Sequence, residues 1–180
     1  FMEFIGLSHK KALEMPQDAK TIISAIKIAR AHTALFDEPF ESNLDTVRLA
    51  EQIVKWNDEH EKLLEEERML HAEIARIGAF GNFSRSELDQ LEEEGKRVFQ
   101  FFCMKSDLAR EMTLPSEVIY VGTEYDLDYF VSINKEPTQY PKMIEILIER
   151  PVGELRERLH QVQDRIANLE SDVRHYSNAL

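Results

Sequence analysis

The second half of the chain carries one apolar stripe that runs to the last residue. Apolar side chains recur there at alternating steps of four and three residues. A repeat of about 3.5 residues keeps one face of a helix against a partner helix, and the pair then supercoils to the left. The sequence therefore predicts a long helix that packs against another long helix. The stripe consists of Leu155, Leu159, Val162, Ile166, Leu169, Val173, Tyr176 and Leu180.

A second stripe with the same alternation lies earlier in the chain. Its members are Leu49, Ile53, Trp56, His60, Leu63, Leu70, Ile74 and Ile77, with Glu67 as the one charged occupant of a seam position. A compact segment separates the two stripes, so the two helices can fold back on each other. We expect an antiparallel coiled-coil hairpin in which Ile77 lies near Leu155 and Leu49 lies near Tyr176.

Charged residues at or beside the stripes lead to two further predictions. The run Glu65–Glu67 reads as a solvated helix face, with Glu67 reaching the seam, where a charge fixes register or meets a basic partner. Glu170 lies off the second stripe. We therefore expect Glu170→Ala to be nearly silent, whereas Ile166→Asp should strongly destabilise the fold.

The composition limits the kinds of partner that this chain can bind. The 180 residues carry a formal net charge of −12, and 31% of them are charged. Nucleic acid is disfavoured as a partner, because phosphate binding depends on lysine and arginine. Anionic lipid headgroups are disfavoured as well, because an acidic surface repels them. Basic protein surfaces are the expected partners.

The single cysteine and the start of the chain also constrain the interpretation. Cys103 lies inside the apolar run 98–104, which predicts a buried structural thiol and a reducing compartment. No stretch approaches the roughly 20 apolar residues of a membrane-spanning helix, and no signal peptide is evident. The chain opens with Phe1 in a strand-like run, which we interpret as a piece of a longer protein.

The segment between the stripes predicts an α+β lobe. Ser84 and Glu87 form a capping-box pattern for a helix that ends near Gly95. The order that follows is strand, helix, three strands, which is the split-βαβ or ferredoxin-like order. Pro137 and Pro141 leave hardly a turn for the second helix of that order. The expected elements are strands 98–104, 117–122, 127–133 and 144–148, with a helix at 107–112 and a turn at Tyr125-Asp126.

The N-terminal part predicts a second, incomplete lobe. Residues 1–5 read as a strand, 19–34 as a helix and 37–43 as a loop in which Asn43 caps the first long helix. The expected domains are a partial lobe (1–43), a first arm (44–78), an α/β lobe at the end of the arms (79–150) and a second arm (151–180).

No residue pattern predicts chemistry. Asp126 and Asp128 could chelate a cation, but a hard cation needs about six oxygens, so a solvated turn is the better interpretation. His60 and His175 are interpreted as packing residues of the helices. Phe99, Phe101 and Phe102 could stack on bases, but the acidity of the chain favours a place in the sheet core. We predict no catalytic residue, cofactor, metal or small-molecule ligand.

Several segments resemble the N-terminal cytosolic domain of subunit I (subunit a) of V-type ATP synthases. The strand 1–5 resembles the membrane-proximal lobe, and the helix Ser-x-x-Glu-Leu-x-x-Leu-Glu-x-x-Gly after 78–83 resembles the entry to the distal lobe. Strand 98–104 is similar to the first distal strand, and 144–151 to the exit strand and return arm. The short stretch around Pro137 departs from the family, whose second distal helix is long.

The resemblance implies a non-catalytic stator of a rotary ATPase that supports ion transport. It implies binding to peripheral-stalk subunits and, through an absent C-terminal half, to the membrane sector, on the cytoplasmic side. A different class, the coiled-coil hinge of chromosome-maintenance ATPases, shares the hairpin and lobe but carries basic patches, which the acidity of this chain disfavours. An enzyme built on the lobe has no supporting motif.

Overall fold

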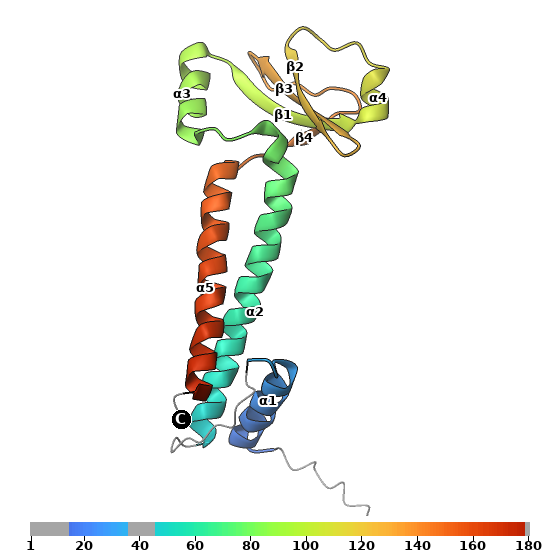
Figure 1. Cartoon of the computed structure of the whole chain (residues 1–180). Coiled ribbons are helices and arrows are strands. Elements are labelled where there is room, and N and C mark those ends of the chain that lie inside the picture. The colour runs from blue at the N-terminus through green and yellow to red at the C-terminus, as the bar shows by residue number, and fades with distance from the viewer. Residues whose placement is uncertain (1–14, 36–45, 179–180) are drawn as a thin grey trace, which may run out of the picture. The chain divides into compact units, whose positions relative to one another are not determined.

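A computed structural model describes residues 15–35 and 46–178, which fall into two compact units. One unit combines residues up to Leu64 with those from Arg165 onward, and the other spans Glu65–Asp164. Both units contain parts of the two long helices α2 (Thr46–Ile77) and α5 (Val152–Asn178) (Figure 1). The predictions for strand 1–5, loop 37–43 and Asn43 lie outside the described residues.

The first unit packs α1 (Gln17–Ala31) with the early part of α2 and the late part of α5. The helix predicted at 19–34 is confirmed with shifted ends. Pro16 stands at its N-cap, where the fixed φ of proline suits a helix start, and His32 ends it. The core of this unit consists of Leu35, Trp56, Leu169 and Val173, with Ile28 and Leu63 packed against them.

The second unit contains a four-stranded antiparallel sheet in the order β2-β3-β1-β4. Its strands are β1 (Val98–Lys105), β2 (Val118–Glu124), β3 (Leu127–Asn134) and β4 (Ile144–Ile146), and α4 (Ser106–Arg110) connects β1 to β2. The predicted α+β class and the predicted element order of this segment are confirmed. β1 and β3 pair along their whole length, while β2 shifts register between Tyr120 and Gly122.

The two faces of the sheet are covered differently. Alternate residues of β1 and β3, among them Phe102 and Phe130, lie in a core with Met104, Val118 and Tyr140, packed under Leu108 and Met112. On the other face, Phe80 of the 3-10 helix η1 (Gly78–Phe80) meets Phe101 and Tyr129 edge-on, and Phe83 stacks on Phe101. The interpretation of the three phenylalanines as sheet core is confirmed for Phe101 and Phe102, whereas Phe99 is half-buried.

Helix α3 (Arg85–Gly95) begins at the predicted capping box. The Glu87 amide donates to Ser84 Oγ at 3.3 Å. Lys96 follows the helix in the left-handed conformation, with φ 47°. In Figure 1, α3 and α4 lie at opposite sides of the sheet.

The connection from β3 to β4 contains no helix, as Pro137 and Pro141 predicted. The buried side chain of Gln100 holds this connection in place, because its Oε1 accepts from the Thr138 amide at 2.8 Å. Its Nε2 donates to Glu145 at 3.2 Å. The buried ring of Tyr140 fills part of the core that a helix would otherwise cover.

The burial of α5 follows the predicted stripe in both units. Ile166, Leu169 and Val173 are buried in the first unit, and Leu155 and Val162 in the second. On α2, Trp56 and His60 are buried in the first unit, and Leu70 and Ile77 in the second. The four-three alternation therefore marks the packed faces of α2 and α5, whereas a single long coiled-coil hairpin stays a prediction.

Candidate protein-binding surfaces

A bidentate ion pair joins α2 to α5 in the second unit. Arg158 Nε and Nη2 donate to the two carboxylate oxygens of Glu66 at 2.6 and 2.9 Å. The hydrogen bond from Arg158 lowers the pKa of Glu66, and partial burial opposes this shift. The sequence analysis expected Glu67 to reach the seam, and the residue of this run that pairs with an arginine of the facing helix is its neighbour Glu66. Both are half-buried.

A corresponding pair joins the same two helices in the first unit. Arg165 Nε and Nη2 both donate to Glu59 Oε1, at 2.9 and 2.6 Å. Sequence reasoning missed both arginine–glutamate pairs. The signal that could have found them is the position of charged residues beside the apolar stripes, where coiled coils place interhelical ion pairs.

Two histidines and a tryptophan cluster in the first unit. The indole of Trp56 stacks on His60 at 4.7 Å between ring centroids, and His32 meets both rings edge-on at 5.4 and 5.6 Å. Trp56 Nε1 donates to the Leu169 carbonyl at 2.9 Å. The interpretation of His60 as a packing residue is confirmed, since it is 4% exposed.

His60 also makes a polar contact that the sequence did not reveal. Its Nε2 donates to Glu170 Oε1 at 3.0 Å, while Nδ1 has no hydrogen-bond partner among the described residues. Glu170 was expected to lie free of the seam. It instead supplies the acceptor for a buried imidazole of the facing helix, because the carboxylate reaches across from the flank of the stripe.

Asp126 and Asp128 take part in the turn between β2 and β3 and its neighbourhood. Asp128 Oδ1 accepts from the hydroxyls of Ser106 and Thr123, each at 2.7 Å. The Asp126 carbonyl accepts from the Ser106 amide at 2.8 Å. These bonds connect the start of α4 to the β2–β3 hairpin. Within residues 15–35 and 46–178, no group of three or more His, Cys, Asp or Glu side chains could hold a metal ion.

The predicted structural role of Cys103 is confirmed. The side chain lies in β1 and is 8% exposed. Burial raises the pKa of the Cys103 thiol, and the charge of Arg76 opposes this only partly. A thiol with a raised pKa holds little thiolate at neutral pH and reacts slowly.

Several exposed apolar side chains of the second unit lie at the two edges of the sheet. On the β2 edge Ile119 and Tyr120 are each 52% exposed, and Tyr125 in the following turn is 98% exposed. Ile144 and Leu147 are exposed at the β4 edge, and Leu91 is exposed on α3. The sequence did not predict these surfaces, because an alternating pattern does not say which strand lies at an edge. Such rims suit protein contacts.

None of the described helices is long and apolar enough to span a bilayer. A comparison with family models found no match, and no solved structure matches.

Curated proteins do show similarity. The chain is 31% identical to the V-type ATP synthase subunit I of Chlamydia muridarum over 121 residues, which are 67% of this chain and 19% of that protein. It is 29% identical to the subunit I of Chlamydia pneumoniae over 134 residues, 73% of this chain and 19% of the relative. The subunit I of Chlamydia trachomatis serovar D is 29% identical over 121 residues. The chain thus spans about a fifth of the length of these relatives.

Proposed function

Because the chain belongs to the family of V-type ATP synthase subunit I, we propose that it is part of the cytoplasmic stator arm of a rotary ATPase. In this role it links the ion-translocating membrane sector to peripheral-stalk subunits and catalyses no reaction itself. The observation that carries the proposal is the similarity to three subunit I proteins over 67% or more of the chain. The proposed role applies to the part of subunit I that this chain represents.

We further propose that α2 and α5 form one antiparallel coiled-coil hairpin. The two arginine–glutamate pairs support this. Glu59 and Glu66 are seven residues apart along α2, and their partners Arg165 and Arg158 are seven residues apart along α5. One heptad on each helix is the spacing that a continuous coiled coil requires. Bidentate arginine contacts would also fix the register of the two helices.

The segment 79–150 would form the distal lobe at one end of this hairpin. Its strands lie in the order β2-β3-β1-β4, and α4 connects β1 to β2 along the chain. Both features support a ferredoxin-like fold that has lost its second helix. Residues 1–43, with α1, would belong to the membrane-proximal lobe. A rigid lever with a lobe at each end suits a subunit that holds a stalk still while a rotor turns.

The partner of the distal lobe would be a helical, net-basic end of a stalk subunit. The net charge of −12 supports a basic partner. Opposite charges on two proteins accelerate their encounter at low salt. Modest affinity is expected for this single contact, because an assembled stator is held at several points and gains by multivalency.

The direct test mixes the 180-residue chain with a purified peripheral-stalk heterodimer and follows binding by calorimetry. NMR shifts of the labelled chain then locate the contact. We expect saturable binding with shifts in residues 80–150 and faster association at low salt. A duplex DNA titrated in parallel serves as the negative control. Binding of DNA without binding of the stalk, at concentrations up to about 100 μM, would refute the stator role.

A further inference from the structure

Helix α3 contributes little to the core of the second unit. None of its residues from Arg85 to Gly95 is buried, and Leu91 is 57% exposed. An isolated helix shorter than about 12 to 15 residues is marginal in water and depends on tertiary packing. Because none of its residues is buried, most of the surface of α3 is not covered by its own unit.

The start of α3 is nevertheless firmly held. Ser84 caps the helix, and the preceding Phe83 stacks on Phe101 of β1 with ring centroids 5.5 Å apart. Asn82 Oδ1 accepts from the Gly153 amide at 3.0 Å, which ties this connection to the start of α5. A helix anchored at one end and exposed along its length is a preformed binding element, because little order would be lost when a partner docks.

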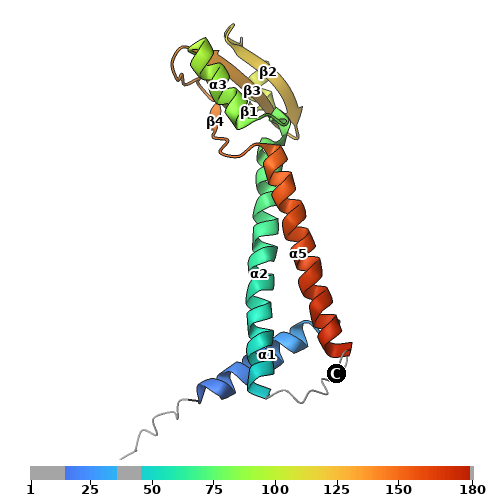
Figure 2. The same ribbon diagram turned by 90° about the vertical axis from the view of Figure 1, so that its left-hand side faces the viewer.

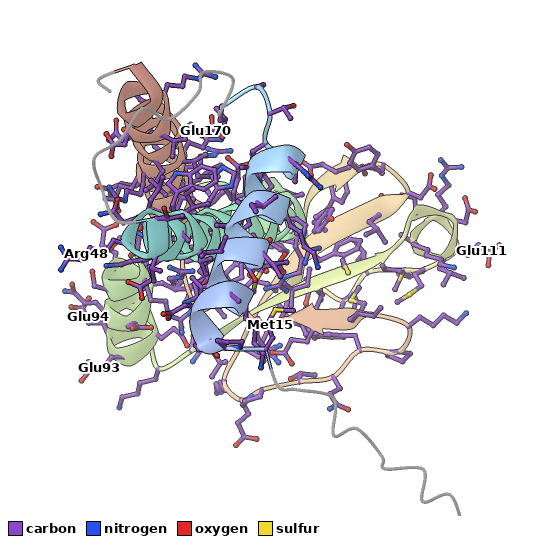
Figure 3. All side chains as sticks on the ribbon, turned by 90° about the horizontal axis from the view of Figure 1, so that it is seen from below. Met15, Arg48, Glu93, Glu94, Glu111 and Glu170 are labelled. Carbon is purple, nitrogen blue, oxygen red and sulfur yellow. The ribbon has the colours of Figure 1, made fainter. Side chains whose placement is uncertain are left out.

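The carboxylates in the last turns of α3 oppose its helix dipole, whereas Glu87 in the first turn and Lys96 at the C-cap suit it. Glu92, Glu93 and Glu94 occupy the last turns, and no basic residue lies in the last turn. Negative charge at a helix C-terminus is unfavourable, because the backbone carbonyls already place partial negative charge there. Glu93 makes no ion pair within the described ranges, and Glu94 accepts only an amide hydrogen bond from Gln90. Figure 3 shows Glu93 and Glu94 pointing away from the sheet.

Acidic and apolar groups share one exposed surface of this helix. Glu87 lies four residues before Leu91 and Glu94 three residues after it, so each of them neighbours Leu91 on the helix surface, whereas Glu93, two residues after Leu91, faces another side of the helix. Leu88, half-buried, extends the apolar part. A second copy of this chain is a poor occupant, because two α3 helices would oppose like charges across Leu91.

We propose that the α3 surface, defined as Leu88, Leu91 and the carboxylates of Glu87 and Glu94, docks a cationic amphipathic helix of a partner protein. An apolar side chain of that helix would cover Leu91, and its lysines or arginines would face the carboxylates and the negative end of the α3 dipole. This inference rests on the proposed function, because it assigns the stalk contact of the distal lobe to one helix. In Figure 2, α3 lies on the side of the second unit that faces the viewer.

The proposal predicts an unusual combination of effects. Glu94→Gln removes repulsion at the end of α3, so the thermal midpoint of the free protein should hold or rise. The same variant should bind the partner about twofold to fivefold more weakly at low salt, and this loss should fade in high salt. Leu91→Ala should weaken binding about fivefold or more through lost apolar contact. A purely structural role for these residues would instead lower the melting temperature.

The matched control removes one charge elsewhere in the second unit. Glu111→Gln changes an exposed residue that directly follows α4, and it alters the net charge by the same amount. Figure 3 shows Glu111 on the far side of the sheet from Glu93 and Glu94. All variants are made in the full 180-residue chain. Binding is measured with the stalk heterodimer and with a synthetic helical peptide of about 18 residues that carries leucine at i, i+4 and lysine elsewhere.

The outcomes separate this inference from the proposed function. Loss of both ligands in the α3 variants, with the control unchanged, supports it. Stalk binding that is equal in all variants overturns the α3 surface and leaves the stator role intact. If the stalk does not bind the unaltered chain, the stator role fails, and the peptide alone decides the inference. Equal peptide binding by the α3 variant and the control then refutes it.

Discussion

The contact between His60 and Glu170 yields a prediction that opposes a simple view of the apolar stripe. Glu170 lies off the stripe, which suggests that its removal would be silent. In the structure, however, it accepts the hydrogen bond of a buried histidine at 3.0 Å. We predict that Glu170→Ala destabilises the protein, whereas Glu170→Gln, which keeps an oxygen acceptor at the same place, does so much less.

The magnitude follows from the burial of the imidazole. His60 is 4% exposed, and its Nδ1 already lacks a hydrogen-bond partner among the described residues. Without Glu170 the donor Nε2–H would lose its acceptor as well. Leaving a buried donor unsatisfied costs about 1–3 kcal/mol. For a chain of this size, each kcal/mol lowers the melting temperature by about 2–4 °C. The expected shift is therefore about 2–12 °C.

A double-mutant cycle isolates this contact. Thermal and urea unfolding are followed by circular dichroism for Glu170→Ala, His60→Phe and the combined variant, at one pH near neutrality. Phenylalanine keeps a ring against Trp56 and has no nitrogen, so Glu170→Ala should cost almost nothing in that background. A coupling free energy of about 1 kcal/mol or more is expected. A cost that is the same in both backgrounds would show that the hydrogen bond does not stabilise the fold.

Three further predictions test the packing and the charges. Ile166→Asp should destabilise the protein by about 3 kcal/mol or more, because it removes a buried side chain and buries a charge. As the control, Asn168→Asp at an exposed position of α5 should be nearly neutral in urea unfolding. Equal effects of the two substitutions would contradict the assignment of Ile166 to the packed face of α5. Cys103 should react with a thiol reagent many times more slowly in the native protein than in denaturant, because burial raises the pKa of its thiol; equal rates would contradict its burial. The pKa of Glu66 is lowered below its ordinary value of 4.5 by the hydrogen bond from Arg158, so the stability that this pair adds is present above pH 4.5 and is lost as pH falls through the lowered pKa. Because both side chains are partly exposed, Glu66→Gln should cost only about 0.2–1 kcal/mol at pH 7, with a smaller penalty in acid; a penalty that grows below pH 4 would refute this sign.

Much of the fold could be predicted because it depends on local or periodic signals. The burial of Leu155, Val162 and Ile166 follows from a repeat that only one helical face can satisfy. The capping box at Ser84 and the prolines around residue 140 act through the backbone of their own neighbourhood, so their consequences were also predictable. Helix α1 was found with shifted ends, because helix ends carry weaker signals than helix interiors.

The polar contacts of the surfaces could not be predicted to the same degree. Whether Glu66 or Glu67 meets an arginine depends on the side-chain directions and the register of two helices, and both glutamates fit the composition of a solvated face. The His60–Glu170 bond depends on the same register. The exposed rim at β2 depends on strand order, which arises from long-range pairing with β3 and β1. Sequence patterns specify what each element buries more directly than what it leaves exposed.

The packing of the sheet core indicates which surfaces of the second unit are available to a partner protein. The ring of Tyr140 meets Phe102 edge-on at 5.3 Å, and its hydroxyl donates to Glu117 and accepts from Asn134. Gln100 fixes the backbone beside it at Thr138. A connection without a helix therefore helps α4 to cover this face of the sheet. Exposed apolar side chains of this unit lie elsewhere, on α3, at the two strand edges and on α2 at Met69. A unit built in this way presents ridges and edges, which suit a protein partner.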